Sequence, residues 1–364
     1  MKRILTFDGG GVRGIYSLQI LARIESLFRA HRKNPNLVLA DEFDFFSGTS
    51  TGAMIAAGLS WGLSVKALED FYLEQGEVLF ARESWNKLWK SKYKETFISD
   101  FFKALFCEDD TEKTPALLGS NKLKTLLLIV TRNASTGSPW PVTNNPNAMY
   151  NQKILPDCNL NIPLWQLLRA STAAPAYFPP QEIEIGDRVD LFLDGAVTQY
   201  NNPSMITLLT ATLPQYNIGW ETGRENIHLI SIGTGKTKTR LTHATAQKVN
   251  MIDQLGHFIP AILASAIDNQ DMMCRVMGDC LYGETIDSEI GDLRQPSLIL
   301  ESQQLFTYVR YNHLFDKKNS LKLSANDIKI DNLSAIPLLQ ELGQEYAENA
   351  VKMEHLFPGQ KTVI

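Results

Sequence analysis

Cysteine is scarce in this 364-residue sequence, and its placement excludes two kinds of structure. The four cysteines lie far apart and form no C-x-x-C pair: Cys107, Cys158, Cys274 and Cys280. This spacing argues against a structural zinc site and against a disulfide framework, and it fits a reducing cytosol. We therefore expect neither a structural zinc site nor a scaffold that depends on disulfides.

Positive charge is also in short supply, since the formal net charge is -5. Proteins that bind nucleic-acid polymers usually carry a basic surplus or a basic stripe. We therefore expect no nucleic-acid polymer as a partner. A membrane surface is not excluded, because a local basic and aromatic patch acts within a Debye length of the lipid headgroups.

Long apolar runs are absent as well. Residues 126–130 form one of the longest, far below the roughly 20 residues that a membrane-spanning helix needs. The apolar stretch at residues 4–7 is too short for a signal peptide. We expect a soluble, cytoplasmic protein that meets a membrane only at its surface.

The sequence does contain short apolar runs that alternate with segments of helical spacing. Strands are expected at residues 4–7, 43–46, 126–131, 191–193 and 227–232, and helices at 15–28, 53–59, 65–80, 164–174 and 204–213. This alternation predicts an α/β fold with a mostly parallel sheet. In such sheets, sites form at the carboxyl ends of strands, and three glycine-containing motifs follow predicted strands here.

One of these motifs surrounds Ser50, with Gly48 and Gly52 two residues away on either side. In this G-x-S-x-G pattern, a nucleophilic serine occupies a strained strand-to-helix turn that closes only around small neighbours. The N-terminus of the following helix favours negative charge. A glycine turn that merely caps the helix is the simpler alternative. The preceding strand and following helix favour a nucleophile.

A glycine loop at residues 8–14 follows the first predicted strand. Glycines leave backbone N–H groups free to face a ligand. In an esterase, the amides of Gly10 and Gly11 would stabilise the oxyanion, and each such donor is typically worth about 3 kcal/mol. The G-x-G-x-x-G spacing also fits a dinucleotide-binding loop, which requires an acidic residue after the second strand. That strand runs into Gly48 and Ser50 instead.

Asp194 ends a short predicted strand and precedes Gly195. On its own, this pair predicts a turn. A general base for Ser50 is the functional alternative, and burial would have to raise the proton affinity of the carboxylate. A Ser-His-Asp triad is a third possibility. Its histidine would be one of five after Ser50, none in a glycine-flanked loop: His228, His243, His257, His313 and His355.

Together, these motifs resemble those of the patatin-like phospholipases. Residues 170–179, 201–203 and 231–235 match too, so the resemblance covers residues 1 to about 240 in order. It implies a three-layer α/β/α sandwich with a central, mostly parallel sheet. It also implies hydrolysis of acyl esters in membrane lipids without metal or cofactor, a Ser50–Asp194 dyad without histidine, and an oxyanion hole at Gly10 and Gly11.

The resemblance gives supporting roles to the small and basic neighbours of these residues: Gly9, Arg13, Gly48, Gly52 and Gly195. Arg13 fills the basic position of the family, where it would order the glycine loop, contact a phosphate or form a structural salt bridge. Residues 1–285 are expected to form the catalytic domain. Residues 286–364 match only loosely and are expected to form a C-terminal extension packed on it, with a regulatory role as a hypothesis.

Some bacterial members of this family resemble effectors that destroy membranes when a cyclic nucleotide binds. The chain is compatible with an antiphage effector of this kind, a homo-oligomer that acts peripherally at the inner membrane on phospholipids. The alternatives are a soluble carboxylesterase or thioesterase and a non-catalytic lipid-binding module.

Residues 84–106 combine aromatic and lysine side chains, and two interpretations remain open. One is an interfacial lid, because such side chains suit a headgroup boundary. The other, which we favour, is a core helix with solvated lysines.

Overall fold

The computed structural model describes residues 1–80, 98–109, 111–175, 177–237, 251–294, 299–315 and 331–359. His243 lies outside these ranges, and so do residues 84–97. Residues 84–97 are most of segment 84–106, for which a lid and a core helix are the two open interpretations. Residues 98–105 of that segment are helical, and the side chains of Phe102 and Phe106 are buried in the core. For this part of the segment, the core interpretation holds.

Within the described residues, the main sheet has nine strands, and its order is β11-β12-β9-β1-β2-β5-β8-β7, with β6 paired to β5. The bounds are β1 (Lys2–Phe7), β2 (Phe45–Thr49), β5 (Leu126–Asn133), β6 (Ser138–Thr143), β7 (Gln181–Ile185), β8 (Arg188–Asp194), β9 (Ile227–Ile232), β11 (Asp279–Tyr282) and β12 (Thr307–Tyr311). The pairs from β11 to β5 along this order are parallel. The β6, β7 and β8 pairings are antiparallel.

Successive residues of the central strands face opposite sides of the sheet. In β1, Leu5 joins one apolar cluster and Ile4 joins the other, and Phe46 and Phe45 of β2 divide in the same way. A strand that is apolar at consecutive positions must therefore be covered on both faces. This is why the short apolar runs of the sequence lie in the centre of a layered structure.

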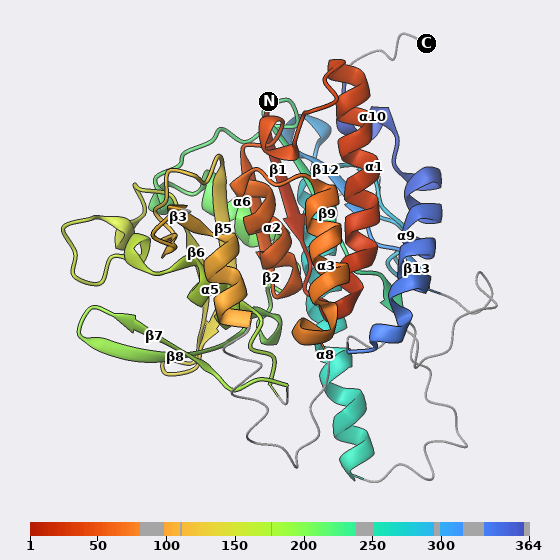
Figure 1. Cartoon of the computed structure of the whole chain (residues 1–364). Helices are drawn as coiled ribbons and strands as arrows, with labels where there is room; N and C mark the ends of the chain where they lie inside the picture. Colours follow the sequence, from red (N-terminus) through yellow and green to blue (C-terminus); the bar gives the residue numbers. More distant parts are fainter. Residues whose placement is uncertain are drawn as a thin grey trace.

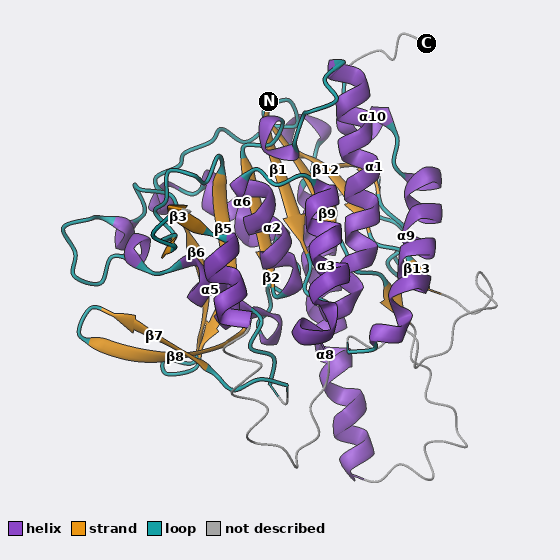
Figure 2. Cartoon of the chain, in the orientation of Figure 1, coloured by secondary structure: helices purple, strands orange, loops and turns teal. Residues whose placement is uncertain are grey.

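Helices cover both faces of the sheet (Figures 1 and 2). One face carries α1 (Gly14–Arg32), α2 (Thr51–Trp61), α3 (Val65–Phe80), α5 (Leu164–Ser171) and α9 (Ile336–Ala350), and the other carries α6 (Ser204–Thr212) and α8 (Met251–Met277). Smaller elements are β3 (Cys107–Asp109), β4 (Thr114–Pro115), β10 (Lys236–Thr237), β13 (Leu314–Phe315) and α10 (Met353–Leu356). The expected three-layer α/β/α sandwich with a mostly parallel sheet is confirmed. Among the described residues, no helix has both the length and the apolar content to cross a bilayer.

The C-terminal region contributes directly to the sheet. β12 lies between β11 and β9 and pairs in parallel with both. The helix α9 packs along α1 (Figure 1), and its Gly343 approaches Gln19 closely. The division of the chain at residue 285 stays a prediction. In the described part of the chain beyond residue 285, β12 is a strand within the main sheet and α9 is a helix of one covering layer.

We predict that a chain truncated after residue 285 does not fold cooperatively. Removing β12 exposes the edge of β9, and removing α9 exposes an apolar face of α1, so the core loses cover on two sides. Thermal unfolding followed by circular dichroism should show a single transition for the full chain and none for residues 1–285. A truncated chain with a full cooperative transition would contradict this and would support a separable extension.

Candidate active site

Ser50 occupies the turn between β2 and α2, with φ 55° and ψ -123°. A positive φ is strained for a residue with a side chain, and such strain persists only when the surrounding structure enforces it. The turn closes because its flanking residues lack side chains. A Cβ atom at Gly48 would overlap the backbone of Gly52, and one at Gly52 would overlap the backbone of Phe7.

The backbone of Ser50 is held by a serine from another element. Ser171, the last residue of α5, accepts the Ser50 N–H at 2.9 Å from its Oγ and donates to the carbonyl of Val130 at 2.7 Å. Ser171 therefore ties the strained turn to the neighbouring strand β5. The sequence placed it in a family-matching stretch but gave it no role. The available signal was a serine at the end of a predicted helix, which is too common to indicate this contact.

Asp194 lies next to Ser50 although 144 residues separate them. Ser50 Oγ donates to Asp194 Oδ2 at 2.7 Å, and Asp194 Oδ1 accepts the N–H of Ala196 at 2.7 Å. The amide of Asp194 donates to the carbonyl of Ala173 at 3.0 Å. One carboxylate oxygen thus caps a turn, as the sequence alone predicted, while the other contacts the serine.

The antiparallel course of β8 determines this position. β8 pairs with β5 only over the last three residues of β5, and Asp194 stands opposite Thr131. The hairpin β7–β8 therefore extends away from the central strands, and β8 returns to their carboxyl edge (Figure 2). Asp194 reaches the edge where β1 and β2 end, although its own strand runs in the opposite direction.

Burial changes the proton affinity of this carboxyl group. Asp194 is 2% exposed and Ser50 is 8% exposed. Burial raises the pKa of Asp194 to about 7, and hydrogen bonds from Ala196 and Ser50 lower it only in part. Near neutral pH the group therefore exchanges readily between its charged and protonated forms, a property suited to a general base.

The glycine loop lies beside the serine. The N–H of Gly9 donates to the Asn201 carbonyl at 3.1 Å, and a Cβ atom at Gly9 would lie 3.2 Å from Ser50 Cβ. Gly11 has φ 58°, a conformation that favours glycine. Among the described residues, we find no acceptor for the amides of Gly10 or Gly11. In the described part of the chain, these two backbone donors therefore have no partner, and they follow Gly9, which lies against Ser50.

Arg13 lies just beyond the other end of the glycine loop. Its Nη1 donates to the carbonyl of Gly235 at 3.3 Å. Burial lowers the pKa of Arg13 to about 10, which leaves the guanidinium charged at neutral pH. This contact joins Arg13 to the loop that follows β9, and the three roles expected for this position stay predictions. Gly195 also has a steric role, because a Cβ atom there would overlap the backbone of Val130.

The histidines that the structure describes lie elsewhere. His228 is buried within β9, His313 contacts Glu284, and His355 contacts Tyr311. In the described part of the chain, no histidine hydrogen-bonds Ser50 or Asp194. In the same part, no group of three or more His, Cys, Asp or Glu side chains has the arrangement of a metal site.

Comparisons with known proteins agree on a family. The family model described as patatin-like phospholipase matches residues 5–208. A cGAMP-activated phospholipase from Vibrio cholerae is 28% identical over 74% of this chain and 75% of its own length. Another from Escherichia coli is 28% identical, and the match spans 64% of this chain and 62% of that protein. Patatin-like protein 4 from Arabidopsis thaliana is 30% identical over 83% of this chain and 78% of its own length.

We predict that Asp194→Asn stabilises the protein at alkaline pH. Because the folded pKa of Asp194 is raised to about 7, the stability that this group contributes is lost as pH rises through about 7. A neutral Asn removes that cost. Urea unfolding at pH 8 should show a gain on the order of 2 kcal/mol over wild type, a smaller gain at pH 5, and little gain near pH 3, where the carboxyl is protonated in both the folded and the unfolded state.

Asp190→Asn is the matched control on the same strand. Asp190 is also buried, but it accepts from Asn133 Nδ2 at 2.9 Å and from Arg188 Nε at 3.2 Å. Loss of this charge removes a partner for Arg188, so we expect no gain in stability. An equal gain for both variants would refute the specific cost at Asp194.

Proposed function

Because the chain belongs to the patatin-like phospholipase family and is therefore a lipid acyl hydrolase, we propose that it cleaves acyl esters of membrane phospholipids with Ser50 as nucleophile and Asp194 as base. The observation that carries this proposal is the contact of Ser50 Oγ with a buried carboxylate at 2.7 Å. The strained turn at Ser50 and the free amides of the glycine loop support it.

In the first half of the reaction, Ser50 Oγ attacks the ester carbonyl while Asp194 Oδ2 accepts the hydroxyl proton. The oxyanion that forms is stabilised by the amides of Gly10 and Gly11. As the tetrahedral intermediate collapses, the bond to the lipid alcohol breaks. Asp194 returns its proton to the departing oxygen, and the acyl group stays on Ser50.

In the second half, water attacks the acyl-enzyme and Asp194 accepts one of its protons. Collapse of this intermediate releases the fatty acid and returns the proton to Ser50. Asp194 must be ionised at the start of each half, and its pKa is about 7. The rate should therefore rise as pH increases through about 7 and fall on the acid side.

A base of this kind needs no histidine. A carboxylate at its ordinary pKa is a weak base at neutral pH, whereas burial brings Asp194 into the range where proton transfer from a hydroxyl is efficient. The second carboxylate oxygen is fixed by Ala196, which aims Oδ2 at the serine. In a triad, a histidine would separate these two side chains; here they are in direct contact.

We predict that Ser50→Ala lowers release of fatty acid from phospholipid vesicles by at least about 10³-fold, because the nucleophile is lost. Ser60→Ala is the matched control. Ser60 is buried on α2, the helix that follows Ser50, and its Oγ accepts a hydrogen bond from Thr125. This variant should keep the wild-type rate. Lipid mass spectrometry of treated vesicles measures the products and identifies the acyl position that is cleaved.

Three results, from assays with other substrates and other variants, would contradict the proposal. Wild-type hydrolysis of a short soluble ester, with none of vesicle lipid, would favour a soluble esterase or thioesterase. Vesicle binding with no hydrolysis of either substrate would favour a non-catalytic module. Loss of turnover in a folded His243→Ala or His257→Ala variant would replace the dyad with a triad.

We further propose that a cyclic nucleotide activates the enzyme. The support is that two relatives, each 28% identical, are named cGAMP-activated phospholipases. Three expectations from the sequence remain hypotheses: the antiphage role, the homo-oligomer and the inner-membrane location. Activation by a cyclic nucleotide would fit all three.

We predict that cGAMP raises the rate of vesicle hydrolysis by roughly 10-fold or more, within the range of ordinary allosteric coupling. The linear dinucleotide of the same composition is the control and should have no effect. Calorimetry with Ser50→Ala measures binding without turnover. Neither binding nor a change in rate would exclude cGAMP as the activator and leave the hydrolase itself unaffected.

A further inference from the structure

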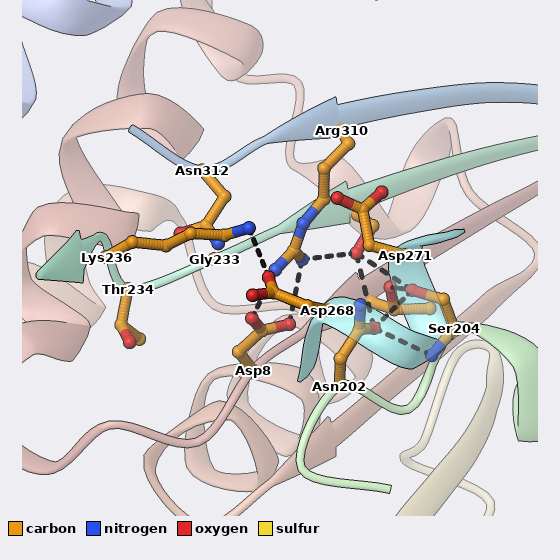
Figure 3. Close-up of polar contacts among 12 residues, drawn as sticks. Asp8, Asn202, Ser204, Gly233, Thr234, Lys236, Asp268, Asp271, Arg310 and Asn312 are labelled. Atoms are coloured by element: carbon orange, nitrogen blue, oxygen red, sulfur yellow. Dashed lines mark hydrogen bonds and ion pairs between the residues drawn. The ribbon is translucent and has the colours of Figure 1, made fainter. Parts of the chain in front are cut away.

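A buried ion pair connects the glycine loop to a distant strand of the sheet. Asp8 is the residue that follows β1, and Arg310 lies in β12; both side chains are 1% exposed. Arg310 Nη1 donates to Asp8 Oδ1 at 2.8 Å, while Nη2 donates to Asp8 Oδ2. Figure 3 shows the guanidinium facing the carboxylate. The contact is bidentate, the geometry that fixes a carboxylate in both position and orientation.

The arginine is itself fixed by the strand between β12 and β1. Arg310 stands opposite Ser231 of β9, and Ser231 stands opposite Thr6 of β1. Arg310 Nη1 also donates to Ser231 Oγ at 2.7 Å, and Ser204 Oγ donates to Ser231 Oγ at 2.8 Å. The guanidinium thus spans three parallel strands, and its placement depends on the register of all three.

Asp8 carries the last side chain before the free amides. From Gly9 to Gly11 the loop has no side chain with which to hold itself in place. Its restraints on this side are the Asp8 N–H to Ile232, the Gly9 N–H to Asn201, the hydrogen bond from Thr234 Oγ1 to the Gly9 carbonyl at 3.4 Å, and the Asp8–Arg310 pair. Among the described residues, the ion pair is therefore the one charged side-chain restraint between the end of β1 and the amides.

β12 also restrains the neighbouring loop on which Arg13 rests. Asn312 Oδ1 accepts the N–H of Gly235 at 3.0 Å, and the carbonyl of Tyr311 accepts the N–H of Gly233 at 2.8 Å. The Gly235 carbonyl in turn accepts from Arg13. β12 and the residue that follows it thus support both ends of the glycine loop, directly through Arg310 and indirectly through Asn312.

We propose that Arg310 is a positioning residue of the hydrolase, which holds the amides of Gly10 and Gly11 in place for the oxyanion by fixing Asp8. Its side-chain hydrogen bonds are to Asp8 and Ser231, and none is to Ser50. The matched family region ends at residue 208, so that Arg310 lies outside it. The inference rests on the proposed function for its catalytic readout, while the placement of the loop is independent of it.

The charge state of the pair is consistent with this role. Burial would lower the pKa of Arg310, but the Asp8 carboxylate and its hydrogen bonds raise that pKa above its ordinary value. The guanidinium therefore stays charged at every working pH. Replacing it leaves Asp8 as a buried carboxyl without its cation, which favours either protonation or movement of the loop toward water.

The test uses the full chain with Arg310→Met, which keeps an apolar side-chain stem and removes the guanidinium that binds both carboxylate oxygens. Sites are counted by covalent titration with a fluorophosphonate, and kcat is expressed per titrated site. We expect kcat to fall roughly 100-fold, as for displacement of oxyanion donors, with KM and the pH midpoint near 7 unchanged. The kcat of Arg310→Lys should lie between the values for Arg310→Met and wild type, because one ammonium cannot reach both carboxylate oxygens and Ser231 together.

Arg275→Met is the matched control. Arg275 forms an equally buried forked pair with Asp271, at 2.9 and 2.8 Å, within α8. This variant removes an ion pair of the same kind without contacting the glycine loop. It should lower the number of folded sites and leave kcat per site within about 3-fold of wild type. Equal values of kcat per site for Arg310→Met and wild type would overturn the proposal.

The double variant Asp8→Asn with Arg310→Met tests the route of action. If Arg310 acts through Asp8, the double variant loses no more activity than the worse single variant. Multiplied losses would show that Arg310 acts by another route and would overturn the proposal.

Hydrogen exchange gives a readout that does not depend on turnover. The amides of Asp8 and Gly9 are hydrogen-bonded and should exchange at least about 10-fold faster in Arg310→Met, but not in Arg275→Met. Unchanged protection of residues 5–14 in a folded Arg310→Met protein would refute the positioning role. If wild type hydrolyses no lipid, the proposed function fails, and exchange still decides whether Arg310 holds the loop.

Discussion

The parallel register of β1 and β2 is the constraint on which the site depends. Phe7 stands opposite Gly48, so the chain leaves both strands at the same edge and within contact distance. The glycine loop continues from one strand and the Ser50 turn from the other. Any slip by one residue would invert the faces of the strand and separate the free amides from the serine. The close approach of Gly52 to the backbone of Phe7, which leaves no room for a Cβ atom, fixes this register.

Around this register, the structure maintains two unfavourable local states. Ser50 has a strained backbone, and Asp194 is a buried carboxyl with a raised pKa. Each is a cost to folding that would be removed by a different residue or conformation. The two side chains are in direct contact, with 2.7 Å between Ser50 Oγ and Asp194 Oδ2. Surplus stability from the two apolar clusters offsets these costs, which explains why the site is surrounded by rigid elements.

Sequence reasoning was most successful where the signal is local. The alternation of short strands and helices, and the turn at Ser50, depend on neighbouring residues and matched the structure closely. The contact of Ser50 with Asp194 is not local, and residues before Asp194 indicated only a turn. Its strand is antiparallel, contrary to the simple rule that sites gather where parallel strands end. Asp194 reaches the site because β8 overlaps only the end of β5, a detail of pairing that no local pattern encodes.

The C-terminal region is a second part of the fold that local sequence patterns could not predict. Strand β12 has an ordinary, short sequence without a motif, so its place between β9 and β11 depends on pairing across distant parts of the chain. A lone arginine in such a strand suggests an exposed position, because arginine is almost never fully buried unless it is paired. Its partner, Asp8, is 302 residues away. In the sequence, Asp8 appeared as the first residue of a glycine motif; in the structure, it is the link between that motif and β12. The chain order of this protein therefore separates what its sheet brings together: the amides lie near the N-terminus, and the side chain that orients their anchor lies near the C-terminus.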